Sequence, residues 1–333
     1  MPAVTSVTRR ATALAAALAL VAAAACSSGS GSGAAGSGTT APVPAGPPYA
    51  VGRRAYTLVD GSRRTPAVPA AHLAAKPDRT VAVELFYPAT GEPGPAPPAD
   101  PATPVAAREN ARPAQGGPFP LVVFAHGFNG TGDAFRGFAE RWARHGYAVA
   151  LPTFPLSRKG IAYSPDYVNQ PGDVSLVIDR MAHALGGAVD TRNVVVGGHS
   201  LGSATIFGVA YNSCCVDRRV AAVISVSGGP LTYPHGNYDH HPTTPLLLVH
   251  GEKDTTVAVG AGNYIFDQRW ARPMWYLRPA AADHVGVFVG EPGRLFEEAT
   301  LAFLDARLRG EAAGLDKVAA DVKASGVADW QVN

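Results

Sequence analysis

The motif GHSLG at residues 198–202 contains the side chain best suited to do chemistry in this chain. It follows an apolar run at 194–196 and precedes a helix-forming stretch at 204–211. A serine on a sharp strand-to-helix turn needs small residues two positions before and after it, because larger side chains would collide with the backbone. The helix N-terminus then favours negative charge that develops nearby. We therefore predict that Ser200 is a nucleophile; the alternative is a glycine-rich turn in which Ser200 only caps the helix.

A serine hydroxyl is a weak nucleophile until a base removes its proton. His284 is the best candidate base, because it lies in a loop after an apolar run at 274–277. Asp254 follows another apolar run at 245–249, and a carboxylate there can orient the imidazole and stabilise its protonated form. The order serine, acid, histidine along the chain is typical of parallel sheets that carry their catalytic residues at the carboxyl edge. The three residues predict nucleophilic catalysis of acyl transfer.

Acyl transfer also needs hydrogen-bond donors for the oxyanion that forms on the substrate. The segment AHGFNG at residues 125–130 follows an apolar run at 121–124, where a backbone N–H can be aimed at a carbonyl oxygen. We predict that the backbone N–H groups of Phe128 and Leu201 form this donor pair, since Leu201 directly follows the nucleophile.

The elements that must position these residues alternate along the chain. Continuous apolar runs indicate strands buried on both faces, and apolar residues at helical spacing indicate helices between them. This alternation predicts an α/β fold, with a mostly parallel sheet and helices on both faces. No insertion after residue 226 exceeds about twenty residues, so no large lid domain is expected. The strands are expected at 80–87, 121–124, 147–151, 193–196, 220–226, 245–249 and 274–277, and the helices at 134–144, 172–185, 204–211, 294–308 and 315–323.

Composition is that of a folded protein with no electrostatic preference for nucleic acid. The chain has 333 residues, of which 47% are hydrophobic and 16% charged, so a sizeable core can form. Its 28 basic and 26 acidic residues give a net charge of +2, which provides no basic surface for a nucleic-acid partner.

The N-terminus has the pattern of an export signal. Two arginines precede an uncharged run at 11–25 that is short for a membrane span, and the run ends at Cys26. This resembles a bacterial lipoprotein signal, in which the cysteine becomes lipidated. We expect residues 1–25 to be a signal peptide, residues 26–50 a flexible tether and residues 51–333 the folded domain. The protein would then be exported, as a cell-surface lipoprotein held to the membrane or, after ordinary signal-peptidase cleavage or twin-arginine export, as a secreted protein.

Several other segments were candidates for special chemistry. Cys214 and Cys215 are adjacent and can pair only through a strained ring, so a structural role near a helix end is favoured, although an oxidising compartment permits a disulfide. The loop at 228–244 contains His235, Asp239, His240 and His241, but it is better interpreted as a solvated rim of the site than as a metal site. A Pro/Ala-rich stretch at 92–118 is expected to be an exposed insertion.

At these residues the chain resembles the α/β-hydrolase superfamily. The segment 124–154, the motif GGHSLGS at 197–203, HGEKDTTV at 250–257 and DHVG at 283–286 are similar to the bacterial chlorophyllase, platelet-activating-factor acetylhydrolase and polyester hydrolase (cutinase-like) group. The similarity extends over residues 51–310. It implies an eight-stranded, mostly parallel sheet, no cofactor and a covalent acyl-enzyme.

Together these features predict a secreted or membrane-tethered serine esterase. Its substrate would be a carboxylic ester, presented by a small molecule, a lipid or a polyester. Two alternatives stay open. An envelope acyltransferase would use the same three residues with an alcohol in place of water, and a non-catalytic binding lipoprotein would keep only the fold.

Overall fold

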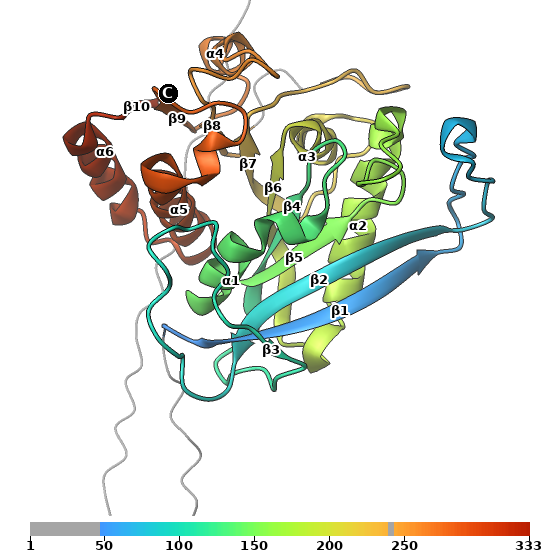
Figure 1. Cartoon of the computed structure of the whole chain (residues 1–333), viewed down its shortest axis with the longest axis horizontal. Coiled ribbons are helices and arrows are strands. Elements are labelled where there is room, and N and C mark those ends of the chain that lie inside the picture. The colour runs from blue at the N-terminus through green and yellow to red at the C-terminus, as the bar shows by residue number, and fades with distance from the viewer. Residues whose placement is uncertain (1–46, 239–242) are drawn as a thin grey trace, which may run out of the picture. The chain divides into compact units, whose positions relative to one another are not determined.

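We describe a computed structural model of the chain, which defines residues 47–238 and 243–333. Within these ranges ten strands form one sheet in the order β10-β9-β8-β7-β6-β4-β5-β2-β1-β3 (Figure 1). Their bounds are β1 Ala50–Asp60, β2 Arg79–Ala89, β3 Arg108–Glu109, β4 Phe119–Ala125, β5 Ala148–Thr153, β6 Val189–His199, β7 Val220–Val226, β8 Leu246–Val249, β9 Met274–Pro279 and β10 Ala328–Val332.

The centre of the sheet is parallel and its edges are antiparallel. Strands β5, β4, β6, β7, β8 and β9 pair in parallel, whereas β2 pairs antiparallel with β5 and β10 pairs antiparallel with β9. The predicted fold class, an α/β fold with a mostly parallel sheet, is therefore confirmed. The sheet has ten strands where the resemblance implied about eight, and the difference includes the two-residue β3 and the C-terminal β10.

Helices cover both faces of the sheet and bury one hydrophobic cluster on each. The first cluster lies under α2, α3 and α4, and the second lies under α1, α5 and α6. The helices are α1 Arg136–Arg144, α2 Gln170–Met181, α3 Leu201–Tyr211, α4 Gly260–Asp267, α5 Gly290–Leu304 and α6 Ala313–Ser325. Short 3-10 segments occur at Pro69–Ala71, Gly132–Phe135, Ser164–Asn169, Ala184–Gly186 and Gly286–Phe288, and a π-helical turn at Asp305–Arg309.

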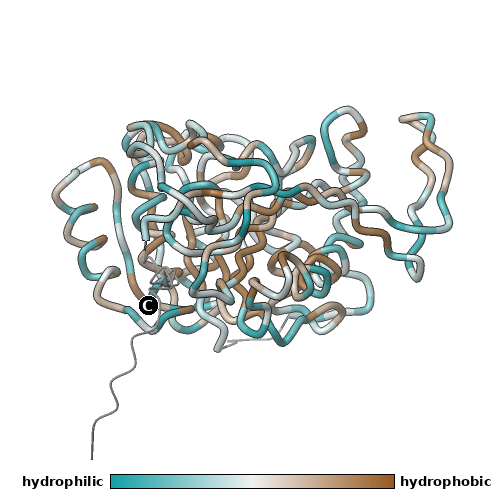
Figure 2. The backbone as a smooth tube through the Cα atoms, turned by 90° about the horizontal axis from the view of Figure 1, so that it is seen from below, coloured by the Kyte–Doolittle hydropathy of each residue, from teal (hydrophilic) through white to brown (hydrophobic). Residues whose placement is uncertain are grey.

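The central strands form because their side chains are apolar on both faces. In β4, Val123 packs into the first cluster and Val122 into the second, and β6 repeats this with Val196 and Val195. Successive side chains of a strand point to opposite faces, so a strand between two helical layers must be apolar throughout. Hydrophobic stretches accordingly run through the interior of the molecule in Figure 2.

The Pro/Ala-rich insertion is held more firmly than the sequence suggested. Arg141, on α1, donates hydrogen bonds to the backbone oxygens of Pro98, Asp100 and Pro101 at 2.6, 3.0 and 3.1 Å. The side chain of Arg141 is itself buried. Most of the insertion is exposed, as expected, but Pro101 is buried, and the buried Arg141 guanidinium satisfies carbonyl groups there that would otherwise need water.

Some predictions fall on residues 1–46 and 239–242, which lie outside the described residues. These are the signal peptide, lipidation at Cys26, most of the tether, and Asp239, His240 and His241 of the loop after β7. They stay predictions, as does the membrane anchor. In the ranges that are described, no helix is both long enough and apolar enough to span a bilayer.

Candidate active site

The predicted site residues gather where parallel strands end. The segment 126–130 follows β4, Ser200 follows β6, the segment 250–254 follows β8, and His284 lies in the loop after β9. Because these four strands are parallel, their carboxyl ends lie at the same edge of the sheet. Ligand sites in open α/β sheets form at this edge.

Ser200 lies on a sharp turn between β6 and α3. Its backbone has φ 56° and ψ −119°, a conformation that non-glycine residues rarely adopt. A Cβ atom on Gly198 would overlap the carbonyl oxygen of Gly202, and one on Gly202 would overlap the carbonyl oxygen of Ala125. The glycines on either side of the serine are therefore required by close backbone approach, as the motif predicted.

His284 and Asp254 are joined by a hydrogen bond of 2.8 Å between His284 Nδ1 and Asp254 Oδ2. The other carboxylate oxygen of Asp254 accepts the backbone N–H groups of Thr256 and Val257, both at 2.9 Å. Burial acts to raise the pKa of Asp254, but the hydrogen bonds from His284, Val257 and Thr256 outweigh it and hold this pKa below its usual value. The ionised carboxylate can only accept, so Nδ1 carries a proton, and in the neutral tautomer of His284 the lone pair is on Nε2.

The loops that carry these two residues are clamped together. The backbone N–H of Lys253 donates to the carbonyl oxygen of Ala282 at 2.9 Å. A Cβ atom on Gly251 would overlap that same carbonyl oxygen, so only glycine permits the approach. The neighbouring Asp283 accepts the backbone N–H groups of Val285 and Gly286 and so stabilises its own loop.

Two further histidines, whose contacts the sequence did not reveal, support this pair. His199 is 8% exposed, and its Nε2–H donates to the backbone oxygen of His284 at 3.0 Å. His250 is 2% exposed, and its Nε2 lies 2.8 Å from the carbonyl oxygen of Val257 and 3.3 Å from Asp254 Oδ2. The spacing of His250 four residues before the acid was a usable signal, whereas the contact of His199 depends on how two loops meet.

Ser200 and His284 lie at the same edge without being hydrogen-bonded. The rings of His199 and His284 have centroids 4.6 Å apart, which brings the residue before the serine against the histidine. Among the described residues no hydrogen bond joins the Ser200 hydroxyl to His284. Catalytic hydrogen bonds often tighten only when substrate is bound, so the serine–histidine contact stays a prediction.

The backbone donors predicted for an oxyanion are unused. Within the described part of the chain, the N–H groups of Phe128 and Leu201 have no acceptor. The next two N–H groups after Phe128 are engaged, since Asn129 donates to Ser157 O at 2.8 Å and Gly130 donates to Gly127 O at 3.1 Å. The loop is therefore fixed by its neighbours while these two donors stay available to a ligand.

The Ser200 groove, as we call it, opens beside the serine and has a volume of about 510 Å³. None of the described residues that line it is charged. Three large apolar side chains at its rim are well exposed: Phe128 at 48%, Leu231 at 43% and Tyr264 at 58%. The groove is lined by Phe128, Ser200, Leu201, Ala204, Gly228, Gly229, Pro230, Leu231, Val257, Ala261, Tyr264 and Ile265. Such a surface fits an uncharged, apolar group.

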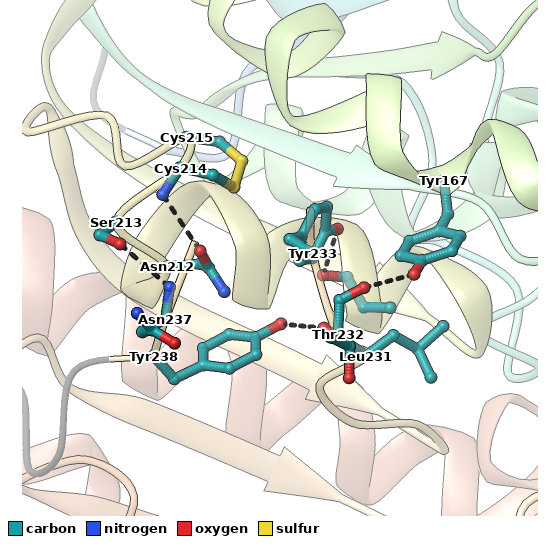
Figure 3. Close-up of a disulfide and its surroundings, with 11 residues drawn as sticks. Tyr167, Asn212, Ser213, Cys214, Cys215, Leu231, Thr232, Tyr233, Asn237 and Tyr238 are labelled. Atoms are coloured by element: carbon teal, nitrogen blue, oxygen red, sulfur yellow. Dashed lines mark hydrogen bonds between the residues drawn. A yellow bond between two sulfur atoms is a disulfide. The ribbon is translucent and has the colours of Figure 1, made fainter. Parts of the chain in front are cut away.

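The expectations about metal binding and about the adjacent cysteines can be compared with the described residues. No group of three or more His, Cys, Asp or Glu side chains in those residues is arranged to hold a metal ion. Cys214 and Cys215 form a disulfide just after α3 (Figure 3). The pair therefore has the helix-end location that the sequence favoured, and it is oxidised as well.

Comparison with known proteins agrees with the architecture. A family model described as alpha/beta hydrolase fold matches residues 120–243. A solved structure, the ferulic acid esterase from Streptomyces cinnamoneus, is similar to this chain, with 25% sequence identity and a TM-score of 0.56. The match covers 78% of this chain and 78% of the esterase chain. No curated protein matches the chain. In all, 803 chains of solved structures match, so the likeness identifies the architecture and leaves the substrate open.

The chlorophyllase, acetylhydrolase and polyester hydrolase group is not singled out by these matches. The parallel sheet covered by helices on both faces, the strand–serine–helix turn at Ser200 and the match to the family model all point to one architecture. The chain has the α/β-hydrolase fold.

Proposed function

We propose that this protein is a serine-dependent carboxylic-ester hydrolase that works through an acyl-enzyme intermediate. The observation that carries the proposal is the hydrogen bond between His284 Nδ1 and Asp254 Oδ2, at the sheet edge where Ser200 opens into an uncharged groove. With Nδ1 held by the carboxylate, Nε2 is the nitrogen of a neutral imidazole that can take a proton from the serine.

In the first step, Ser200 Oγ attacks the ester carbonyl carbon while His284 Nε2 removes the hydroxyl proton. The carbonyl oxygen becomes an oxyanion, which the backbone N–H groups of Phe128 and Leu201 stabilise. His284 then carries a positive charge, which the buried carboxylate of Asp254 offsets. Collapse of the tetrahedral intermediate breaks the bond to the alcohol, which takes the proton from His284 as it leaves.

In the second step, water replaces the alcohol. Neutral His284 removes a proton from the water as it attacks the acyl-enzyme carbonyl, and the same two N–H groups hold the second oxyanion. The intermediate collapses to the free acid, and Ser200 regains its proton from His284. Apart from the leaving alcohol, every group that gives or takes a proton is a side chain of this chain or water.

The substrate class follows from the groove. A carboxylate or ammonium group entering it would lose its hydration without finding a charged partner, so neutral esters are favoured. The aromatic side chains of Phe128 and Tyr264 can contact an aromatic or aliphatic acyl group. The resemblance to a protein named ferulic acid esterase adds esters of aromatic acids to the candidates.

The decisive test replaces Ser200 with alanine. Ser200→Ala removes the nucleophile, so hydrolysis of p-nitrophenyl butyrate is expected to fall by a factor on the order of 10⁴–10⁶ in kcat. The matched control is Ser62→Ala, which changes an exposed serine in the turn between β1 and β2 and should keep wild-type turnover.

Covalent labelling can identify the nucleophile directly. A fluorophosphonate probe should add one adduct, located at Ser200 by mass spectrometry, and none to Ser200→Ala. Turnover that survives in purified, folded Ser200→Ala would contradict the proposal. Product analysis with an added alcohol distinguishes release of the acid from transfer to that alcohol.

A further inference from the structure

One wall of the Ser200 groove is a segment without regular secondary structure. Pro230 and Leu231, which line the groove, lie between β7 and a turn at 234–235. The described part of this segment has no strand or helix to fix its backbone, so its position must come from other contacts.

Tyrosine hydroxyls supply those contacts. Tyr238 donates a hydrogen bond of 2.7 Å to the carbonyl oxygen of Leu231, and Tyr167 donates one to the carbonyl oxygen of Thr232 (Figure 3). Tyr233, within the segment, donates at 2.9 Å to Ala204 O on α3. Three hydroxyl groups thus hold three consecutive residues of the wall.

One of these donors rests on a buried ion pair. Tyr167 lies in the 3-10 segment Ser164–Asn169, and the neighbouring Asp166 accepts two hydrogen bonds from Arg79, at 3.0 and 2.8 Å. Both charged side chains are at most 1% exposed. Breaking such a pair is costly, so the anchor for Thr232 is firm.

The other donor rests on the disulfide turn. Ser213 N–H donates to Asn237 O at 2.9 Å, and Asn237 N–H donates back to Ser213 Oγ at 3.0 Å. Ser213 directly precedes the disulfide between Cys214 and Cys215, and Figure 3 shows this turn beside the base of Tyr238. A covalent ring at this point reduces the number of conformations that the turn can adopt.

The hydroxyl of Tyr238 is suited to this task. Burial raises its pKa above the usual value, so the hydroxyl stays protonated and can donate. Its ring packs edge-on against Trp270, with centroids 5.2 Å apart. The side chain therefore spans the distance between the disulfide turn and the groove wall in one fixed direction.

We propose that Tyr238, held by the disulfide-closed turn at 212–215, is a positioning residue that sets the Leu231 wall of the Ser200 groove and thereby determines selectivity for long apolar acyl groups. The inference rests on the proposed ester hydrolysis and deepens it. A fixed wall contacts each methylene of a long acyl chain, whereas a short acyl group does not reach it. Loosening the wall should therefore lower kcat/KM for long-chain esters more than for short-chain esters.

The test compares Tyr238→Phe with Tyr211→Phe. The first variant keeps the ring against Trp270 and removes the hydroxyl that donates to Leu231 O. The second removes the hydroxyl that donates to Thr244 O at 3.2 Å, a contact that does not involve the groove. The readout is the ratio of kcat/KM for p-nitrophenyl octanoate to that for p-nitrophenyl acetate. We expect the ratio to fall about 5-fold in Tyr238→Phe, mainly through KM, and to stay at the wild-type value in Tyr211→Phe.

A second arm tests the disulfide turn. Cys214→Ala/Cys215→Ala should lower the same ratio, and adding Tyr238→Phe to it should lower the ratio further by less than 5-fold, because both changes act on one structural path. An unchanged or increased ratio in folded Tyr238→Phe, or full additivity with the cysteine variant, would overturn the inference.

Failure of the two proposals can be told apart. A wild-type protein that hydrolyses neither ester contradicts the proposed function. The affinity of Ser200→Ala protein for the neutral dye Nile red reports on the apolar surface of the groove in the absence of catalysis. Weaker binding after Tyr238→Phe, but not after Tyr211→Phe, supports the inference, and equal binding in both variants contradicts it.

Discussion

The two sides of Ser200 are built in different ways. On one side, Asp254 and His284 belong to a hydrogen-bonded network in which the Asp254 side chain is 0% exposed. On the other side, Leu231 and Tyr264 present apolar surface that is 43% and 58% exposed. The first side fixes donors and acceptors by hydrogen bonds, and the second presents an apolar surface to solvent.

This difference indicates how much each side should contribute. A proton transfer depends steeply on the tautomer and direction of one imidazole, so a change on the network side should alter the rate by orders of magnitude. An apolar contact contributes in proportion to the area it buries, so a change on the groove side should alter affinity by a small factor. The predictions that follow run from the larger effect to the smaller.

After removal of the nucleophile itself, the largest effect is expected from Asp254→Asn. The amide can donate a hydrogen bond to His284 Nδ1 and so stabilise the wrong tautomer, as in the serine-protease triad, where the same change lowers kcat by about 10⁴. We expect kcat for p-nitrophenyl butyrate to fall by a factor on the order of 10³–10⁴. The control is Asp283→Asn, because Asp283 uses its carboxylate only to accept two N–H groups of its own loop, which an amide oxygen can also accept. Similar rates in both variants would contradict the role of Asp254.

An intermediate effect concerns the acid stability of the network side. Burial, the main cause, lowers the pKa of His199 to about 4 from an ordinary value of 6.5. Below pH 6.5 the unfolded chain therefore takes up a proton that the folded chain refuses until about pH 4. The free energy of unfolding should fall with pH across this window, by up to ~3 kcal/mol for this group. Burial likewise lowers the pKa values of His126 and His250, which adds a change of the same sign.

Urea unfolding at pH 7.5, 5.5 and 4.5 measures this slope. In His199→Gln the part of the slope that His199 causes should disappear, so the wild type and the variant should differ less at pH 4.5 than at pH 7.5. His183→Gln, a change at an exposed position, serves as the control. A wild-type stability that stays constant from pH 7.5 to 4.5 would contradict the inference that these histidines are buried in their neutral form.

The smallest effect is expected from Tyr264→Ala on the groove side. Removing the exposed ring deletes contact with an apolar acyl group worth about 1 kcal/mol, so KM for p-nitrophenyl octanoate should rise about 5-fold. The value of kcat should change little, because Tyr264 touches no group that moves a proton. Val59→Ala removes an exposed apolar side chain on β1 and is the control. A loss in kcat without a change in KM would contradict the inference that the groove side acts on substrate affinity and not on the rate.

Much of the fold could be predicted because buried strands and amphipathic helices have distinct patterns. The apolar run at 121–124 lies within β4, and the expected helix at 315–323 lies within α6. Bounds were less certain, since α5 begins at Gly290 and the helix ahead of β6 ends at Met181. The strands β1 and β3 at one end of the sheet and β10 at the other were not predicted, because strands near the ends of a sheet need apolar residues on one face only and their pattern is weaker.

The parts of the candidate site that lie in short local motifs could be predicted from the sequence. The glycines around Ser200 and the position of Asp254 after β8 are local features that a strand and a turn make visible. The contacts of His199, Tyr167 and Tyr238 could not be predicted, because each joins segments that are distant in sequence or lie in an irregular loop.

The sequence by itself determined the type of sheet, the turn that exposes Ser200 and the order of the residues that could act with it. These depend on local sterics and on the periodicity of apolar side chains, both of which act over a few neighbouring residues. Only the tertiary structure decided that His284 Nδ1 meets Asp254, that His199 donates to the loop of His284, and that Tyr238 holds the groove wall. Hydrogen bonds between loops depend on how strands of different length and register bring their ends together, and no single segment contains that information.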